Sequence, residues 1–484
     1  MTSAPAAEGG GRTGISPPPG TDVRTLEPIE ASRPTGVEAE ADHTAGISRR
    51  ALLGRAAAFA CGLFAIGAAQ SEAASTGGWP RASAYGAEVP TVWFDLALGL
   101  VRTTPGFSPP VASRAFGYAG VALYEAVAPG IKRRSFAGIL NGLTRAPGPA
   151  DDAYHWPTVA NSALAEILRL LFPTTPSGNL AATADLERRF AGEAEAVLPF
   201  GIYKRSVSRG AEVARHIFDW SKSDGGHEAF LDNFPAYAPP SGPGLWVPTP
   251  PGFLPALQPY WGANRPFAAG SDEACSPGPP PAFSENAGSA FYAEAYECYR
   301  VTSNLTSERE AIARFWSDDP GQTASPPGHS ISILTQVARE FDITLDRAAE
   351  AYAKVGAAVA DAFISCWRTK YRHNLLRPVT YIRSVIDPRW APLLITPPFP
   401  EYTSGHSVQT AAAAQVLTSM FGQLAFTDHT HDGRGLPPRS FSSFAAAAEE
   451  AAISRMYGGI HFRAAIERGL EQGACIGERV AVLA

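Results

Sequence analysis

The sequence predicts an all-α fold, a helical bundle core wrapped by a long proline-rich loop. Most segments after Trp79 repeat apolar residues at three- and four-residue spacing, and no run alternates in the manner of strands. With 484 residues, 45% of them hydrophobic, the chain is long enough to bury a sizeable core. One proline-dense stretch admits neither a helix nor a central strand, and it accounts for the loop.

Helical periodicity marks successive stretches from the first third of the chain to its C-terminus. The first two stretches end at Pro129 and Pro173, and proline cannot continue a helix. The expected helical segments are 111–129, 156–173, 182–200, 208–226, 285–303, 345–372, 404–422, 444–459 and 460–484.

The proline-dense stretch lies between Asn233 and Phe283. Its Trp and Phe residues predict that it packs on the bundle as a lid or wrap, since a linker has no need of them. No internal repeat of fixed period is visible, so we expect one catalytic domain over residues 76–484.

The N-terminal region has the pattern of a targeting signal. Residues 1–46 are rich in Pro, Gly, Ala and Glu without apolar periodicity, which predicts disorder. Residues 47–75 place Arg49-Arg50 before a modest apolar run and a small-residue exit, as in a twin-arginine signal peptide. The alternatives are a misassigned start with an uncleaved anchor helix, and lipid attachment at Cys61, which Phe59 disfavours. Export predicts a periplasmic or secreted protein without stable membrane insertion.

The formal net charge of −6 argues against nucleic acid as the main partner, so an anion site must be a local cluster of cations. Signal removal leaves four scattered cysteines, enough for two disulfides at most, and no C-x-x-C spacing marks a zinc or redox site.

Three stretches concentrate positive charge and histidine. In WRTKYRHNLLRP, Lys370 and Arg377 are seven residues apart, which predicts one face of one helix ended by Pro378. In YTSGHS, Ser404, Gly405 and His406 open a helix, whose N-terminal N–H groups and dipole favour an anion.

In the third stretch, SRMYGGIHFR, Arg455 and His461 are six residues apart. One straight helix would put them on different faces, but Gly458-Gly459 permits a break that lets both reach a common point. Each stretch alone fits a bland interpretation: a solvated helix face, an ordinary N-cap or a packed imidazole. Together they predict a cage for a small tetrahedral oxyanion, with one imidazole free to attack or coordinate its central atom.

The motifs K-x6-R-P, S-G-H and S-R-x5-H resemble the three-part signature of the vanadium-dependent haloperoxidases and the related type-2 phosphatidic acid phosphatases. Thr403 replaces the usual proline before Ser404. The resemblance spans roughly residues 90 to 484, with its diagnostic part in 367–469. It implies the helical fold of the haloperoxidase and acid phosphatase type, and vanadate as cofactor in a site that phosphate can also occupy.

The resemblance also implies roles for single residues. His461 would be the axial vanadium ligand, or the phosphorylated nucleophile of a phosphatase, and His406 would be the acid/base. The residues implied to hydrogen-bond the equatorial oxygens are Lys370, Arg377, Ser404, Gly405 and Arg455. Trp367 and Phe399 match positions that line the halide side of the pocket in related chloroperoxidases. Asp319 would pair with Arg455.

Three features remain outside this set. Family members commonly carry an Asp four residues after the ligand histidine, where this chain has Ala465; we expect the ligand imidazole to lack an orienting carboxylate, which disfavours a phosphatase. The run 428–432, Asp-His-Thr-His-Asp, has metal-ligand residue types, but its polar context ending in Gly433 favours a solvated loop. His329, in a Pro-Pro-Gly-His stretch, is a weaker candidate for a site residue than Asp319.

These observations predict an exported, vanadate-dependent haloperoxidase that oxidises halide with hydrogen peroxide to hypohalous acid by a peroxovanadate mechanism. The first alternative is an acid phosphatase that hydrolyses phosphomonoesters through a phosphohistidine. The second is a non-catalytic protein that binds an oxyanion.

Overall fold

The computed structural model describes residues 79–131, 134–148, 153–268 and 270–483. The disorder expected for 1–46, the signal peptide expected for 47–75 and Cys61 all lie outside these residues. The prediction of an all-α fold is confirmed, because helices dominate and the strands among the described residues form a single two-stranded antiparallel sheet. None of the helices seen in the described part is both long and apolar enough to cross a bilayer.

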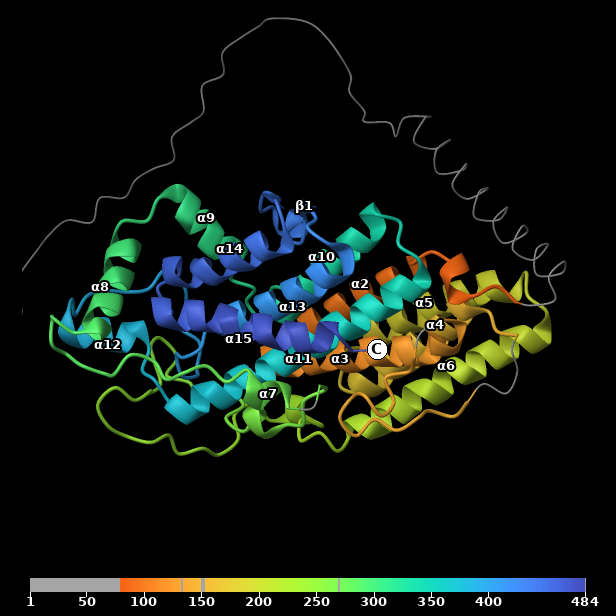
Figure 1. The fold of residues 1–484 in the computed structure, drawn as a ribbon, viewed down its shortest axis with the longest axis horizontal. Helices are drawn as coiled ribbons and strands as arrows, with labels where there is room; N and C mark the ends of the chain where they lie inside the picture. Colours follow the sequence, from red (N-terminus) through yellow and green to blue (C-terminus); the bar gives the residue numbers. More distant parts are fainter. Residues whose placement is uncertain (1–78, 132–133, 149–152, 269, 484) are drawn as a thin grey trace, which may run out of the picture. The chain divides into compact units, whose positions relative to one another are not determined.

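The elements follow one another as labelled in Figure 1. The α-helices are α2 (Glu88–Thr103), α3 (Pro109–Val127), α4 (Trp156–Leu171), α5 (Ser177–Glu195), α6 (Phe200–Ser221), α7 (Ser271–Ala274), α8 (Ala290–Ser303), α9 (Ser307–Phe315), α10 (Ser325–Glu340), α11 (Leu345–His373), α12 (Pro378–Val385), α13 (Gly405–Phe421), α14 (Phe444–Tyr457) and α15 (Arg463–Ala481). The strands are β1 (Phe426–Asp428) and β2 (Arg439–Phe441), and the 3-10 turns are η1 (Ala82–Ala84), η2 (Ala128–Gly130), η3 (Ala229–Leu231), η4 (Trp261–Ala263) and η5 (Asp432–Arg434).

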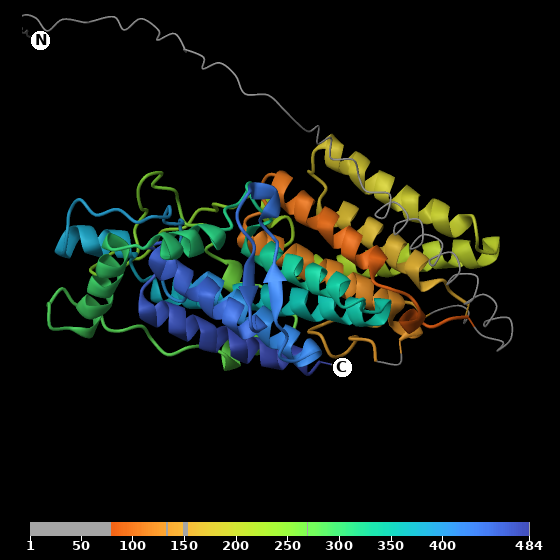
Figure 2. The same cartoon turned by 90° about the horizontal axis from the view of Figure 1, so that it is seen from above.

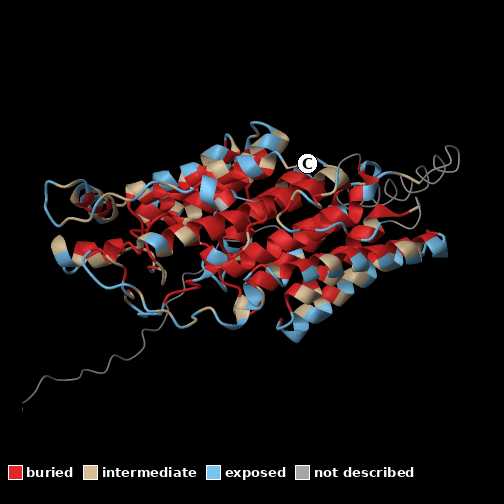
Figure 3. Cartoon of the chain, turned by 60° about the horizontal axis from the view of Figure 1, so that its bottom comes forward, coloured by how far each residue is buried: buried red, intermediate tan, exposed pale blue. Residues whose placement is uncertain are grey.

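The centre of the core is the contact between α3 and α11, most of whose residues are buried. Figure 3 shows the buried residues concentrated in the inner helices. Glycines set how closely these helices approach. A Cβ on Gly120 would lie 2.3 Å from the Tyr352 carbonyl oxygen, and one on Gly356 would lie 2.7 Å from that of Phe116. Real Cβ atoms do not come this close to backbone, so the glycines permit a packing distance that no larger residue allows.

Close packing at glycines also joins α13 to α15, which lie alongside α11 in Figure 1. A Cβ on Gly473 would lie 2.1 Å from the Val408 carbonyl oxygen, and one on Gly477 would lie 2.6 Å from that of Ala412. The alanine-rich sequence of α13 supplies small side chains to this contact. Helix α15, which follows the third stretch, is thereby fixed against α13, which begins at the second stretch.

Helices α4, α5 and α6 pack on the α3 side of the core, and the view from above shows α5 and α6 (yellow) as its outer layer (Figure 2). Most side chains of α5 are solvent-exposed, in keeping with this position.

The proline-rich stretch packs on the bundle, as predicted. Trp246 and Trp261 are buried, and the Trp246 N–H donates to the Asn374 carbonyl just beyond α11. The Leu257 carbonyl accepts hydrogen bonds from Trp367 Nε1 at 3.2 Å and from the Tyr371 hydroxyl at 2.7 Å. The loop is therefore bound to the C-terminal end of α11, where the first stretch begins.

Cys275 and Cys475 form a disulfide that links α7 to α15 across 200 residues of sequence. Cys298 and Cys366 are buried free thiols, so one of the two possible disulfides is present.

We predict that Cys275→Ser lowers the free energy of unfolding by about 2–4 kcal/mol, because the crosslink restricts the unfolded chain over a long loop. Denaturant unfolding of the oxidised wild type and of the variant measures the difference. Reductant should lower the stability of the wild type to that of the variant and leave the variant unchanged. Equal stability of the two oxidised proteins would contradict the prediction.

Candidate active site

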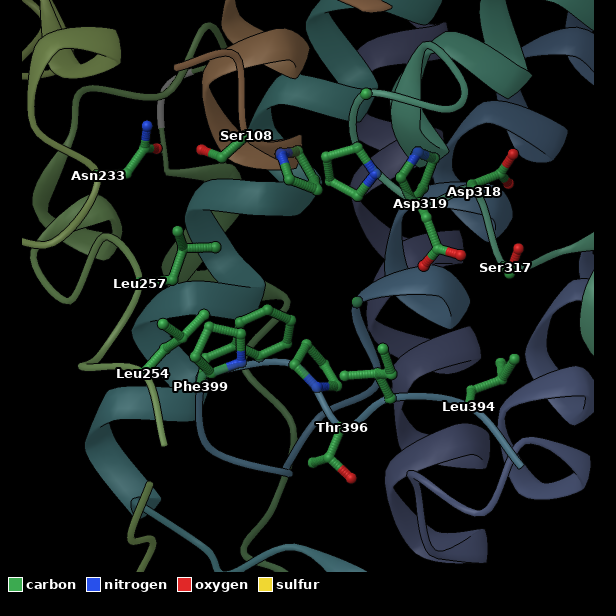
Figure 4. A pocket seen from close by; sticks show the side chains of 18 of the residues that line it. Ser108, Asn233, Leu254, Leu257, Ser317, Asp318, Asp319, Leu394, Thr396 and Phe399 are labelled. Atoms are coloured by element: carbon green, nitrogen blue, oxygen red, sulfur yellow. The ribbon is translucent and has the colours of Figure 1, made fainter. Parts of the chain in front are cut away.

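A cavity of about 860 Å³ opens between the proline-rich loop and the ends of the central helices (Figure 4). One side is apolar, with Leu254, Leu257 and Phe399, and the opposite side carries Asp318 and Asp319. The cavity is lined by residues of all three predicted stretches: Trp367 from the first, Gly405 and His406 from the second, and Arg455 and His461 from the third. Lys370, Arg377 and Ser404 are fully buried behind this lining.

The prediction that Lys370 and Arg377 share one helix is wrong. Helix α11 ends at His373 because Asn374 adopts the left-handed conformation (φ 45°). Arg377 is the N-cap of α12, and Pro378 begins that helix, in the first-turn position that proline tolerates. The two cations meet because the chain turns between them; both lie over the Phe399 ring, at 5.1 Å for Lys370 Nζ and 4.8 Å for Arg377 Cζ.

Ser404 is the N-cap of α13, as predicted, and its hydroxyl accepts a hydrogen bond from the Ser407 N–H at 3.4 Å. Gly405 is the first helical residue. A Cβ there would point toward Trp367 across the cavity lining and stay 3.7 Å away, so the fold alone does not require a glycine at this position. A ligand that fills this space and contacts the backbone would require one.

The predicted break between Arg455 and His461 is confirmed. Helix α14 ends at Tyr457, and Gly459 is left-handed (φ 73°), so His461 lies in the turn before α15. Arg455 is held by its own neighbour Ser454, whose hydroxyl accepts from Nε at 3.0 Å, and by the Ala313 carbonyl at 3.3 Å from Nη2.

Glu401 orients His461, and sequence reasoning missed it. His461 Nδ1 lies 2.9 Å from Glu401 Oε1, which also accepts the Phe462 N–H at 2.8 Å. Arg377 Nη1 lies 3.3 Å from His461 Nε2. Because a guanidinium only donates, Nε2 must carry the lone pair and Nδ1 the proton that Glu401 accepts. The ring therefore presents a lone pair toward the cations, which is the form that coordinates a metal or attacks an electrophile.

The expectation that the ligand imidazole lacks an orienting carboxylate, drawn from Ala465, is therefore wrong. The imidazole does have a carboxylate partner, supplied by residue 401 instead of residue 465, and the argument against a phosphatase falls with it. Position 465 contributes its backbone, since the Ala465 carbonyl accepts the Ser404 N–H at 2.9 Å. The one available signal was an acidic residue three positions before Ser404, with no spacing rule to connect it to His461.

Burial dominates the electrostatics of this pair. It raises the pKa of Glu401 to about 8, against the opposing effects of the Phe462 N–H and of Lys370 and Arg377. It lowers the pKa of His461 well below the usual range, and the nearby charges of Arg377, Lys370 and Arg455 lower it further. His461 therefore stays neutral at neutral pH and keeps its lone pair on Nε2.

Lys370 donates to three backbone carbonyls, of Pro400 at 3.0 Å, Glu401 at 2.9 Å and Thr403. These acceptors use all three ammonium protons. Burial lowers the pKa of Lys370 to about 7. To bind an anion oxygen, as predicted, Lys370 has to give up its hydrogen bond to one of these carbonyls and donate to the anion instead.

His406 also lines the cavity, but its environment differs from that of His461. Its Nε2 is buried and has no partner among the described residues, while the Trp316 carbonyl accepts a hydrogen bond from the ring. By elimination that bond uses Nδ1, so Nε2 is the free acceptor. Burial, followed by the Arg455 charge, lowers the pKa of His406 well below its usual value. A neutral imidazole that faces the cavity is placed to take up a proton there.

Trp367 and Phe399 both line the cavity, with ring centroids 4.9 Å apart. Trp367 is held by its hydrogen bond to the Leu257 carbonyl, so the proline-rich loop fixes the apolar side. Asp319 lines the opposite side but forms no ion pair with Arg455 in the described part of the chain. Asp318 and, to a smaller extent, Asp319 raise the pKa of Arg455, which burial lowers to about 10.

The interpretation of 428–432 as a solvated loop is wrong for two of its five residues. Asp428 and His431 are buried and reach His329 and Asp318 from across the fold, whereas His429 and Asp432 are exposed. Burial of charged groups needs partners, and the loop folds inward to provide them.

The residues present fit a vanadate or phosphate ion. Arg377 Nη2 is buried and lacks a hydrogen-bond partner within the described residues, a costly condition that an anion oxygen would relieve. Three cations, the unpaired N–H groups at the start of α13 and the space left open at Gly405 surround the His461 lone pair. Lys370, Arg377, Gly405, Arg455 and His461 could hold the ion.

Comparisons with known proteins point to one family. The family model described as "VCPO second helical-bundle domain" matches residues 350–484. A solved structure described as the first bacterial vanadium-dependent iodoperoxidase is 41% identical over 82% of this chain and 96% of its own, with a TM-score of 0.75. Holo and apo structures of bacterial vanadium-dependent chloroperoxidase, 18% and 16% identical, share the fold with TM-scores of 0.61 and 0.59; they cover 79% and 77% of this chain and 93% of their own. No curated protein matches.

We predict that Glu401→Gln weakens vanadate binding by about 10- to 100-fold at pH 8.5, because the neutral amide no longer raises the basicity of His461. That pH lies above the Glu401 pKa of about 8, where the wild-type carboxylate is ionised. Equilibrium dialysis with orthovanadate measures the affinity. The control is Glu467→Gln, the same change at an exposed α15 residue. Equal affinity of Glu401→Gln and wild type would contradict the positioning role.

We also predict that the contribution of Lys370 to anion binding falls as pH rises above 7. The pKa of about 7 in the free site means that Lys370 is charged below this pH; a bound anion raises the pKa, so binding takes up a proton above it. The ratio of wild-type to Lys370→Met affinity for vanadate should shrink between pH 6.5 and 8.5. Comparing the two proteins at each pH cancels the titration of vanadate itself. A constant ratio in a folded variant would refute the assignment.

Proposed function

The chain belongs to the vanadium-dependent haloperoxidase family, and we propose that it oxidises halide with hydrogen peroxide at the cavity described above. Its relatives are oxidoreductases of the peroxidase type, and so is this enzyme. The single observation that carries the proposal is the line Glu401–His461–Arg377, which aims a neutral imidazole lone pair into a cluster of buried cations. The arrangement suits coordination of an electrophilic oxyanion centre.

Each cation has a defined part. Arg377 is fixed by the Phe399 and Ile460 carbonyls at 2.7 and 2.9 Å, which leaves Nη2 to hold one anion oxygen. Arg455, on α14, approaches from the side of the cavity that carries Asp318. The N–H groups at the start of α13 hold oxygens through the backbone, and Gly405 leaves room for them.

Bound vanadate would supply a Lewis-acidic centre that activates hydrogen peroxide for two-electron oxidation of halide. The overall reaction consumes one halide ion, one hydrogen peroxide and one proton, and yields hypohalous acid and water. The oxidant is the peroxide, whose oxygen–oxygen bond breaks. Halide is the species oxidised.

His406 handles the proton. Its Nε2 faces the cavity without a partner, and the Trp316 carbonyl holds the other side of the ring. A neutral His406 can accept a proton from peroxide as it binds and return it to the oxygen that leaves as water. The pKa of His406 lies well below the usual range, so the ring begins the cycle neutral.

The apolar side of the cavity suits a large, weakly hydrated anion. Trp367 and Phe399 give the cavity an apolar aromatic wall, and Lys370 lies over the Phe399 ring. We propose iodide as the preferred halide, with support from the 41% identical relative described as an iodoperoxidase. Iodide is also the easiest of the three heavier halides to oxidise.

The cellular place of the enzyme is also part of the proposal. The pair Arg49-Arg50 before a modest apolar run supports export by a twin-arginine signal, after which residues 76–484 act as one domain in the periplasm or outside the cell.

We predict that purified protein loaded with orthovanadate oxidises iodide in a peroxide-dependent reaction, measured as triiodide formation. His461→Ala should retain no vanadate after gel filtration, measured by elemental analysis, and show no oxidation. Loss of activity without loss of vanadate would contradict the ligand role of His461.

The alternatives give different results in the same preparation. A phosphatase would hydrolyse aryl phosphate without vanadate and be inhibited by it. A non-catalytic protein would bind vanadate tightly with neither activity. Absence of oxidation with iodide, bromide and chloride in vanadate-loaded protein would refute the proposal.

A further inference from the structure

A second cluster of ligand-type side chains lies beside the cavity and is not used by the proposed reaction. Asp318 follows α9, His329 lies in the first turns of α10, and Asp428 and His431 come from β1 and the loop after it. All four are buried, with at most 2% of their surface exposed. One ligand atom from each of Asp318, His329 and His431 lies within 4.8 Å of the other two.

Asp428 orients His329. Its Oδ1 accepts the Thr430 N–H at 2.9 Å, and its Oδ2 lies 2.7 Å from His329 Nε2. The Nε2–H of His329 thus donates to Asp428, and Nδ1 faces Asp318 Oδ2 at 2.9 Å. A carboxylate behind an imidazole, with the far ring nitrogen turned to a shared point, is the usual surrounding of a metal-bound histidine.

One close approach in the cluster does not have the geometry of a hydrogen bond. His431 Nε2 lies 3.3 Å from Asp318 Oδ1, yet neither atom makes an acceptable hydrogen bond to any described residue, although both are buried. The contact of His329 Nδ1 with Asp318 Oδ2, in contrast, is a hydrogen bond: against the opposing effect of burial, Asp318 and Asp428 raise the pKa of His329 to about 10, so without a metal both ring nitrogens carry a proton. A cation between the three residues would take the place of the proton on His329 Nδ1 and would also fill the gap between His431 and Asp318.

The spacing and the charge both suit a divalent ion. His431 Nε2 lies 3.3 Å from Asp318 Oδ1, about the separation of two donor atoms bound at 2.0–2.2 Å with a tetrahedral angle. His329 Nδ1 lies 2.9 Å from the other oxygen, Oδ2, so Asp318 would bind the ion through both oxygens. With neutral imidazoles, Asp318 and Asp428 carry two negative charges in a buried site. A divalent cation neutralises them without any further group.

We propose that Asp318, His329 and His431 bind a divalent transition-metal ion, with zinc(II) as the best-matched ion, and that Asp428 supports the site from behind. One contact has to change. His431 Nδ1 lies 3.5 Å from Arg434 Nη1, and metal binding at Nε2 places a proton on Nδ1 and releases this exposed arginine. The ion is separate from vanadate, and the site does not rest on the proposed function.

The ion would fix one wall of the cavity. Asp318 lines the cavity, and the carbonyl that holds His406 belongs to Trp316, two residues earlier. Trp316 itself stacks on His329, with ring centroids 4.4 Å apart. The metal joins this turn to α10 and to the loop after β1, so its role is structural support of the wall that carries the acid/base histidine.

The test uses the full protein, stripped with chelator, equilibrated with zinc(II) alone and passed through gel filtration. We expect about one zinc per chain in the wild type by elemental analysis, and less than a tenth in Asp318→Asn and His431→Gln. The control His429→Gln changes an exposed histidine two residues from His431 and should retain zinc fully. Arg434→Ala should retain zinc as well, and His461→Ala should retain zinc while losing vanadate.

Thermal unfolding and cobalt(II) spectra separate a metal site from a misfolded variant. Zinc should raise the unfolding temperature of the wild type and of His429→Gln, but not that of Asp318→Asn. Cobalt(II) should give visible absorption in the wild type that is lost in folded Asp318→Asn. Two results would overturn the proposal: less than a tenth of an equivalent of zinc in the wild type, or as much zinc in Asp318→Asn and His431→Gln as in the wild type. Either would leave the cluster as a network of ion pairs.

Discussion

The site depends on the hydrogen bond between His461 and Glu401. A neutral imidazole has one lone pair, and the partner of its other nitrogen decides where that lone pair points. Glu401 takes the Nδ1 proton, so Nε2 is left to the cations. Without this bond the ring could present its N–H to Arg377, two donors would face each other, and the cage would hold no coordinating atom.

The segment 400–403 brings the three stretches into one unit. Its carbonyls hold Lys370 at the end of α11, its Glu401 side chain holds His461 before α15, and it leads directly into the N-cap Ser404. Buried charges are costly unless they are paired. The segment pairs Lys370 through carbonyl oxygens, which satisfy the ammonium while leaving the cluster positive for an anion.

Much of the fold and most of the site residues could be predicted from sequence, because both depend on local patterns. Helical periodicity is local, and the Gly458-Gly459 break follows from backbone freedom at glycine. One error had a local origin: Asn tolerates the left-handed conformation that ends α11 at residue 374, and the prediction placed the helix end at Pro378 instead. The other errors arise where a contact joins distant positions. The contact between Glu401 and His461 spans 60 residues and follows no spacing rule.

The burial of residues in the run 428–432 also depends on a distant partner that local sequence does not reveal. A polar stretch appears solvated until the fold supplies a buried partner, and here His329 lies 99 residues before Asp428. Burial then follows from pairing, since these side chains enter the interior only together.

The two imidazoles of the cavity differ because their supports differ. Above the Glu401 pKa of about 8, the carboxylate behind His461 adds electron density to the ring and suits a ligand. The Trp316 carbonyl behind His406 orients the ring while adding no charge, which suits a group that gains and loses a proton. The support of His406 lies in the turn that also carries Asp318, so any group that holds Asp318 in place also sets where the proton acceptor of the cavity stands.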